Sequence, residues 1–131
     1  MAKVLIVDDS QIVLSLHSYI FEGAGFECAV AENGFLALEM LNREHFDLVV
    51  TDVNMPRMDG YELTHRVRRT PGYEDVPIII ISTEEEAKDK MKGMEAGANI
   101  YVVKPAEPAS LIANANMLLG GPKATEKSGN T

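Results

Sequence analysis

Five short apolar runs alternate with five stretches of helical periodicity along this chain of 131 residues. This regular alternation of strand and helix is typical of an α/β domain with a parallel sheet. Because crossover connections are right-handed, the helices must cover both faces of a doubly wound sheet. We expect the strands at about 3–7, 27–31, 47–51, 77–81 and 100–103. We expect helices at about 10–24, 59–70, 84–97 and 107–119, and a further helix that begins after the Asn33-Gly34 turn.

The pattern of apolarity also predicts which elements are buried. The runs at 47–51 and 77–81 are continuously apolar, which indicates central strands covered on both faces, whereas 27–31 alternates and is expected at an edge. In the first helix, apolar residues recur at helical spacing at Ile12, Leu16 and Tyr19. The buried stripes expected in the other helices are Leu36, Ala37, Met40 and Leu41, then Ala87, Met91 and Met94, and then Leu111, Ile112, Ala115 and Leu118.

Composition limits the class of protein. The hydrophobic fraction of 46% and charged fraction of 24% are those of a soluble globular domain, expected over residues 1–119, with residues 120–131 as a disordered tail. The net charge of −8 argues against direct nucleic-acid binding, and the basic residues 65–69 are explained by a helix C-terminus. No apolar run is long enough for membrane insertion, and no signal peptide is visible. The single cysteine, Cys28, fits a reducing, cytoplasmic location.

Polar side chains follow four of the five expected strands. Asp8 and Asp9 follow the first run, Asp52 the third, Ser82 the fourth and Lys104 the fifth. In open α/β sheets, ligands bind outside the carboxyl ends of the strands, so these groups are expected at one site. Three carboxylates this close repel one another and therefore need a cation.

The oxygen ligands in this cluster suit Mg²⁺, or Mn²⁺ in its place. We expect Asp9 and Asp52 as direct ligands, Asp8 acting through a metal-bound water, and a backbone carbonyl near Asn54 as a further ligand. A carboxylate beside such a metal can attack phosphorus and form an aspartyl phosphate. The ammonium of Lys104 can then neutralise one phosphoryl oxygen, and the hydroxyl of Ser82 can donate a hydrogen bond to another.

These residues resemble the receiver domain of bacterial two-component response regulators, of the stand-alone CheY-like kind. The resemblance covers about residues 2–119. It implies a flavodoxin-like fold with five strands in the order 2-1-3-4-5 and five helices. The motifs that carry it are Val-Asp8-Asp9-Ser, Asp52-Val-Asn-Met-Pro56-x-Met-Asp59-Gly60, Pro77-x4-Ser82 and Ala96-Gly97-Ala98-x2-Tyr101-x2-Lys104-Pro105.

The resemblance also assigns roles. It implies that Asp52 accepts a phosphoryl group from a histidine kinase or a small phosphodonor, that Lys104 contacts that group, and that the Lys104–Pro105 bond is cis. Ser82 and Tyr101 match the switch hydroxyl and switch aromatic, through which the face formed by helix four, strand five and helix five changes its affinity for an output protein. Asn54 and Glu84 match positions that tune dephosphorylation. One departure is Ala106, where many relatives carry a large apolar residue.

Particular residues disfavour several other functions. A flavodoxin-like electron carrier needs a loop that holds the flavin phosphate, which Asp8 and Asp9 would repel. A dehalogenase-type phosphohydrolase carries Asp-x-Asp after its first strand, whereas Ser10 and Gln11 follow Asp9 here. A metal-free pseudo-receiver would not need the complete set of acids, hydroxyl and lysine. The expected function is a phosphoacceptor rather than a turnover enzyme, with chemotaxis or motility as the pathway and a phosphorelay to a histidine phosphotransfer protein as the alternative.

Overall fold

The structure is a computed structural model that describes residues 2–83 and 90–120. Its centre is a parallel sheet with the strand order β2-β1-β3-β4-β5, the order that the resemblance implied. This is the flavodoxin-like, doubly wound arrangement. The expected tail lies almost entirely outside the described residues. The strands are β1 (Lys3–Val7), β2 (Glu27–Ala31), β3 (Leu48–Asp52), β4 (Ile78–Ser82) and β5 (Ile100–Val103).

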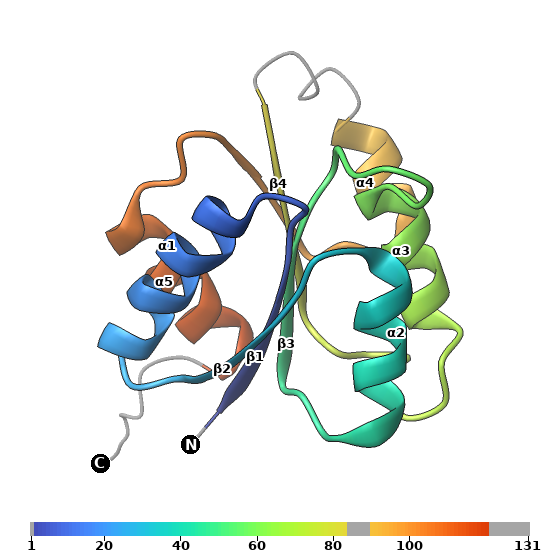
Figure 1. Ribbon diagram of the computed structural model, residues 1–131, viewed down its shortest axis with the longest axis horizontal. Helices are drawn as coiled ribbons and strands as arrows, with labels where there is room; N and C mark the ends of the chain where they lie inside the picture. Colours follow the sequence, from blue (N-terminus) through green and yellow to red (C-terminus); the bar gives the residue numbers. More distant parts are fainter. Residues whose placement is uncertain (1, 84–89, 121–131) are drawn as a thin grey trace.

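Five helices cover the two faces of the sheet (Figure 1). Helices α1 and α5 lie on one face, and α2, α3 and α4 lie on the other. Side-chain caps begin three of them: Ser10 accepts from the Val13 N–H, Asn33 from the Leu36 N–H and Asp59 from the Glu62 N–H. The expected beginning of the fourth helix at residues 84–86 lies outside the described part. The helices are α1 (Gln11–Gly23), α2 (Gly34–Arg43), α3 (Gly60–Arg68), α4 (Lys90–Ala96) and α5 (Pro108–Leu118).

The core consists of two apolar layers separated by the sheet. Alternate residues of β1 enter different layers: Leu5 and Val7 pack on the side of α2 and α3, and Val4 and Ile6 pack on the side of α1 and α5. All five residues of β3 and all five of β4 are buried, as their continuous apolarity predicted, and β2 is an edge strand as expected.

The buried faces of two helices differ from the expected ones. On α1 the buried residues are Leu14, His17 and Phe21, whereas Ile12, Leu16 and Tyr19 are exposed. The α1 sequence carries apolar residues on two faces, and contact with the sheet decides between them. On α4, Met91 and Met94 are exposed because the side of the helix that carries Gly93 faces the core. Ala87 lies outside the described residues.

The other two expected stripes are largely correct. Ala37 and Leu41 of α2 and Leu111 and Ala115 of α5 are buried. Of the remaining residues in these stripes, Leu36 is exposed, and the others, Met40, Ile112 and Leu118, are partly buried.

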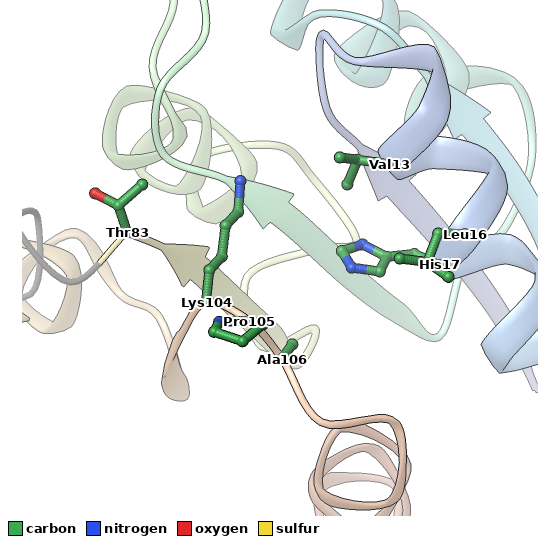
Figure 2. A pocket seen from close by; sticks show the side chains of 7 residues that line it. All are labelled: Val13, Leu16, His17, Thr83, Lys104, Pro105 and Ala106. Carbon is green, nitrogen blue, oxygen red and sulfur yellow. The ribbon is translucent and has the colours of Figure 1, made fainter.

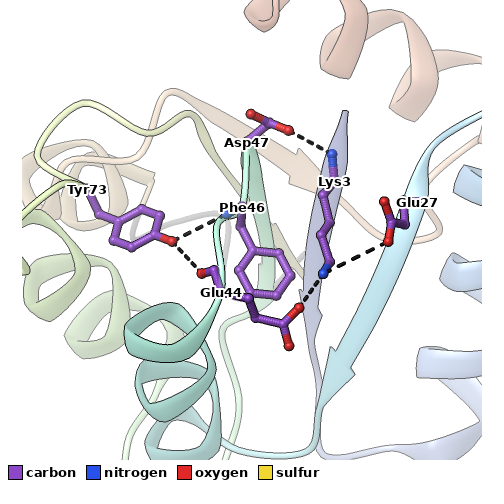
Figure 3. Close-up of polar contacts among 6 residues, drawn as sticks. All are labelled: Lys3, Glu27, Glu44, Phe46, Asp47 and Tyr73. Atoms are coloured by element: carbon purple, nitrogen blue, oxygen red, sulfur yellow. Dashed lines mark hydrogen bonds and ion pairs between the residues drawn. The ribbon is translucent and has the colours of Figure 1, made fainter. Parts of the chain in front are cut away.

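A polar network closes the amino end of the sheet (Figure 3). The Lys3 ammonium lies against the carboxylates of Glu44 and Glu27, and the Lys3 backbone N–H donates to Asp47 at 2.8 Å. The Tyr73 hydroxyl donates to the Glu44 carbonyl oxygen at 2.8 Å and accepts from the Phe46 N–H at 3.3 Å. These bonds tie β1 to the connection before β3, at the end opposite the carboxylate cluster. Within residues 2–83 and 90–120, no helix has the length and apolarity needed to cross a bilayer.

Candidate functional site

Three aspartates meet at the carboxyl end of the sheet. Strands β1 and β3 are neighbours with Val7 opposite Thr51, so Asp8 and Asp9 follow β1 beside Asp52 at the end of β3. One carboxylate oxygen from each of the three lies within 4.8 Å of the others. Asp8 and Asp52 are buried, and Asp9 is exposed. The arrangement predicted from strand ends is therefore present in the fold.

The electrostatics of this cluster favour a bound cation. Burial raises the pKa of Asp8 to about 6, and repulsion from Asp52 and Asp9 adds to the effect. The Ser10 N–H, which donates to Asp8 Oδ1 at 2.9 Å, and the Lys104 ammonium oppose this rise. Carboxylate oxygens close together in this way fit a hard divalent cation such as Mg²⁺. Asn54, expected near the metal, is exposed two residues beyond Asp52.

Lys104 reaches the cluster from the end of β5. Its Nζ lies 2.8 Å from Asp52 Oδ1, with the Lys104 side chain 31% and the Asp52 side chain 6% exposed. The Lys104 backbone N–H donates to the Ser82 carbonyl oxygen at 2.6 Å, which ties the ends of β4 and β5 together. The Lys104–Pro105 bond is cis, as the resemblance implied. The expected lysine and aspartate are thus in direct contact.

Ser82 lies one residue beyond the β4 partner of Asp52. In the β3–β4 register Asp52 is opposite Ile81, and Ser82 follows at the strand end, with no exposed surface. Its hydroxyl donates to the Thr83 carbonyl oxygen at 3.2 Å. Thr83 itself is exposed.

Tyr101 lies in β5 and connects to α3 and α4. Its hydroxyl is 3.1 Å from that of Tyr61, and a Cβ on Gly93 would lie 3.0 Å from the Tyr101 ring and 3.2 Å from the Tyr61 ring. The Lys92 ammonium lies 5.4 Å from the centre of the Tyr61 ring. Sequence reasoning did not identify Tyr61, because the contact between α3 and β5 exists only in the folded chain. Glu84, the other expected tuning residue, lies outside the described residues.

The loop between β3 and α3 positions Asp52 through Gly60. The Gly60 N–H donates to the Val53 carbonyl oxygen at 2.8 Å. A Cβ at residue 60 would lie 2.2 Å from the Asp52 carbonyl oxygen, a distance that excludes every side chain. The Asp59-Gly60 pair in the sequence is the signal for this contact.

His17 is a further residue that the sequence did not single out. Only 7% of this α1 residue is exposed. It lines a cavity that Lys104, Pro105 and Ala106 also line (Figure 2).

This geometry can be compared with known proteins. The model of the response regulator receiver domain matches residues 4–116. The chain belongs to this family. A solved structure of the chemotaxis protein CheY4 from Vibrio cholerae is 37% identical and superposes with a TM-score of 0.86 over 91% of this chain and 99% of that one. Receiver domains bind Mg²⁺ at an acidic pocket and take phosphoryl groups from histidine kinases.

Two curated relatives are similar over most of this chain. An uncharacterised 14.6 kDa protein of Leptolyngbya boryana is 38% identical over 109 residues, which are 83% of either protein. The gliding motility regulatory protein of Myxococcus xanthus is 34% identical over 113 residues, which are 86% of this chain but 14% of that protein. The chain spans about half the length of other curated relatives that it matches.

Proposed function

We propose that the chain acts as the receiver domain of a response regulator and accepts a phosphoryl group on Asp52 in an Mg²⁺-dependent reaction. The observation that carries this proposal is the 2.8 Å pair between Lys104 Nζ and Asp52 Oδ1, beside the cluster with Asp8 and Asp9. The donor is the phosphohistidine of a histidine kinase or a small phosphodonor. Since one phosphoryl group is accepted and later hydrolysed, the protein is a switch with weak self-phosphorylation and self-dephosphorylation.

Each residue of the site has a different part in the phosphoryl transfer. An Asp52 oxygen bonds to phosphorus, the bond from phosphorus to the donor breaks, and its electron pair leaves with the donor. The carboxylates of Asp8, Asp9 and Asp52, with a backbone carbonyl near Asn54, would hold Mg²⁺, or Mn²⁺ in its place. The bound metal would neutralise charge on the phosphoryl oxygens. The Lys104 ammonium moves from the free carboxylate to a phosphoryl oxygen.

Ser82 and Tyr101 transmit the change to a partner. The Ser82 hydroxyl turns from the Thr83 carbonyl oxygen to the phosphoryl group, and Tyr101 changes its position against Tyr61. The contacts of Tyr101 with α3 and α4 support this role, because they join the strand end to the face formed by α4, β5 and α5. Phosphorylation then shifts the population between two states of that face, which bind an output protein with different affinities.

The pathway we favour is chemotaxis or motility in the cytoplasm, without direct contact with nucleic acid. Similarity to a chemotaxis protein and to a gliding motility regulator supports this choice. Asn54, with Glu84, would keep the phosphorylated state short-lived. A phosphorelay to a histidine phosphotransfer protein is the second candidate. A long-lived phosphorylated state would favour this function. The lifetime of the phosphorylated protein therefore separates the two functions.

The first test is intact mass after incubation with acetyl phosphate, with Mg²⁺ or with EDTA. We expect a single phosphoryl adduct in Mg²⁺ on the wild type and none on Asp52→Asn. Asp47→Asn, the same change outside the cluster, is the matched control and should be labelled like the wild type. An adduct that survives in Asp52→Asn would show that another residue is the acceptor, and no adduct on the wild type would favour a pseudo-receiver.

A further inference from the structure

A cavity of about 360 Å³ lies between α1 and the connection from β5 to α5 (Figure 2). Val13, Leu16 and Ala106 give it apolar walls. Lys104 and Thr83 stand at one side, and the imidazole of His17 points from α1 toward Lys104. The cavity thus combines an apolar interior with polar groups near Asp52.

His17 is a buried polar residue that is available to form a hydrogen bond with a ligand. Only 7% of it is exposed, and among the described residues neither ring nitrogen has a hydrogen-bond partner. A buried polar group in this state costs free energy that a bound molecule can recover. Burial, with a contribution from the Lys104 ammonium, lowers the pKa of His17 below its usual value. At neutral pH the ring is therefore uncharged, with one N–H to donate.

The cavity is open because residue 106 is small. Ala106, which follows the Lys104–Pro105 pair, contributes only a methyl group to the wall of the cavity. The cavity also adjoins the site of phosphoryl transfer, because Lys104 both lines it and contacts Asp52 at 2.8 Å. A molecule whose phosphoryl group reaches Asp52 can therefore place an attached apolar group beside Ala106.

We propose that the cavity receives the acyl group of acyl phosphates, so that the chain accepts its phosphoryl group preferentially from donors with a bulky apolar acyl group. The inference rests on the proposed function of Asp52. Acyl phosphates belong to the same chemical class as the aspartyl phosphate, since both are mixed anhydrides of a carboxylic acid and phosphoric acid. Transfer between them therefore needs no other energy source.

The step involves one oxygen of Asp52 and two atoms of the donor, its phosphorus and the acyl oxygen bonded to it. An Asp52 oxygen forms a bond to phosphorus while the bond between phosphorus and the acyl oxygen breaks. The electron pair remains on that oxygen, and the leaving group is a carboxylate that takes up no proton. The acyl oxygen atoms gain negative charge as the bond breaks, and the His17 N–H donates a hydrogen bond to one of them.

The test compares benzoyl phosphate with acetyl phosphate as donors in Mg²⁺, with the rate of the Asp52 adduct followed by intact mass. The quantity of interest is the ratio of the two second-order rate constants. Ala106→Phe fills the cavity, so the ratio of rate constants measured in this variant reflects only the difference in chemical reactivity between the two donors. Ala113→Phe makes the same change at an exposed position of α5 and is the matched control. His17→Leu removes the hydrogen bond and retains an apolar surface.

We expect the benzoyl-to-acetyl ratio to be at least about tenfold higher in the wild type and Ala113→Phe than in Ala106→Phe, with a lower ratio also in His17→Leu. Equal ratios in wild type and Ala106→Phe, with both proteins labelled by acetyl phosphate, would overturn this inference and leave the proposed function intact. Failure of both donors to label the wild type would overturn the proposed function as well. Far-UV circular dichroism identifies any variant that is not folded.

Discussion

At the scale of single residues, Asp8 shows how a functional site costs stability. Its buried carboxyl has a pKa of about 6, against an ordinary value of 3.8. The folded protein therefore disfavours the ionised form. The stability linked to Asp8 is fully present below pH 3.8 and is lost as the pH rises through about 6. The penalty at neutral pH comes mainly from burial of the Asp8 carboxyl, and repulsion from Asp52 and Asp9 adds to it.

Asp8→Asn should therefore stabilise the metal-free protein at pH 7. The expected gain in the free energy of unfolding is on the order of 1 to 3 kcal/mol, and it should shrink as the pH falls toward 4. The measurement is urea unfolding in EDTA at several pH values, followed by circular dichroism. A gain in stability that stayed the same at every pH would show that ionisation of Asp8 is not its cause.

Asp47→Asn provides a control in which the expected change in the free energy of unfolding has the opposite sign. Burial would raise the pKa of Asp47, but the Lys3 N–H and His45 outweigh it and lower the pKa below its usual value. Stability from Asp47 is thus present above the ordinary pKa and lost as the pH falls. We expect Asp47→Asn to destabilise the protein at pH 7, with a difference that fades in acid.

Sequence reasoning predicted the residues at strand ends but not His17. Parallel strands bring their carboxyl ends to one edge of the sheet, so Asp8, Asp52 and Lys104 could be grouped from their positions alone. The burial of His17 depends on which side of α1 meets the sheet. Local periodicity does not decide this, because α1 carries apolar residues on two faces.

At the scale of elements, the contact between β3 and α3 limits residue 60 to glycine. We expect Gly60→Ala to lower the free energy of unfolding by about 2 to 4 kcal/mol, because its Cβ would meet the Asp52 carbonyl oxygen at 2.2 Å and one backbone segment must move. The displaced strand end carries Asp52, the proposed acceptor, so the rate of labelling by acetyl phosphate should fall by at least about tenfold.

Gly23→Ala is the matched control for this substitution. Gly23 ends α1, and a Cβ there would meet nothing within 4 Å. Its stability should stay within about 0.5 kcal/mol of the wild type, with labelling unchanged. If Gly60→Ala behaved like Gly23→Ala, the close approach of α3 to the acceptor would not be a requirement of the site.

Other contacts between elements were beyond sequence reasoning. The basic residues 65–69 were explained by the dipole of a helix end, but Arg68 has a more specific role. Its guanidinium donates to the carbonyl oxygens of Gly97 at 2.8 Å and Val76 at 2.6 Å, and to Asn99 Oδ1 at 2.9 Å. These partners are 8, 29 and 31 residues away in the chain, in the connections before β4 and before β5, and only the folded structure brings them together.

At the scale of the whole molecule, the acidic cluster links metal binding to folding. The carboxylates come from β1 and β3 and meet only when the sheet is complete, so Mg²⁺ should bind the folded chain far better than the unfolded one. A ligand at one hundred times its Kd stabilises a protein by about 2.7 kcal/mol. For a domain of this size, that corresponds to a rise in Tm of roughly 5 to 10 °C.

We therefore expect MgCl₂ to raise the Tm of the wild type above its value in NaCl of matched ionic strength, which screens surface charges equally. Asp9→Asn removes an exposed carboxylate of the cluster and should abolish most of the rise, whereas Asp47→Asn changes the same charge outside the cluster and should retain it. Equal shifts in all three proteins would mean that Mg²⁺ acts by general screening of the net charge of −8. Selective loss in Asp9→Asn would instead mean that Mg²⁺ binds at the carboxylate cluster and links the ends of β1 and β3.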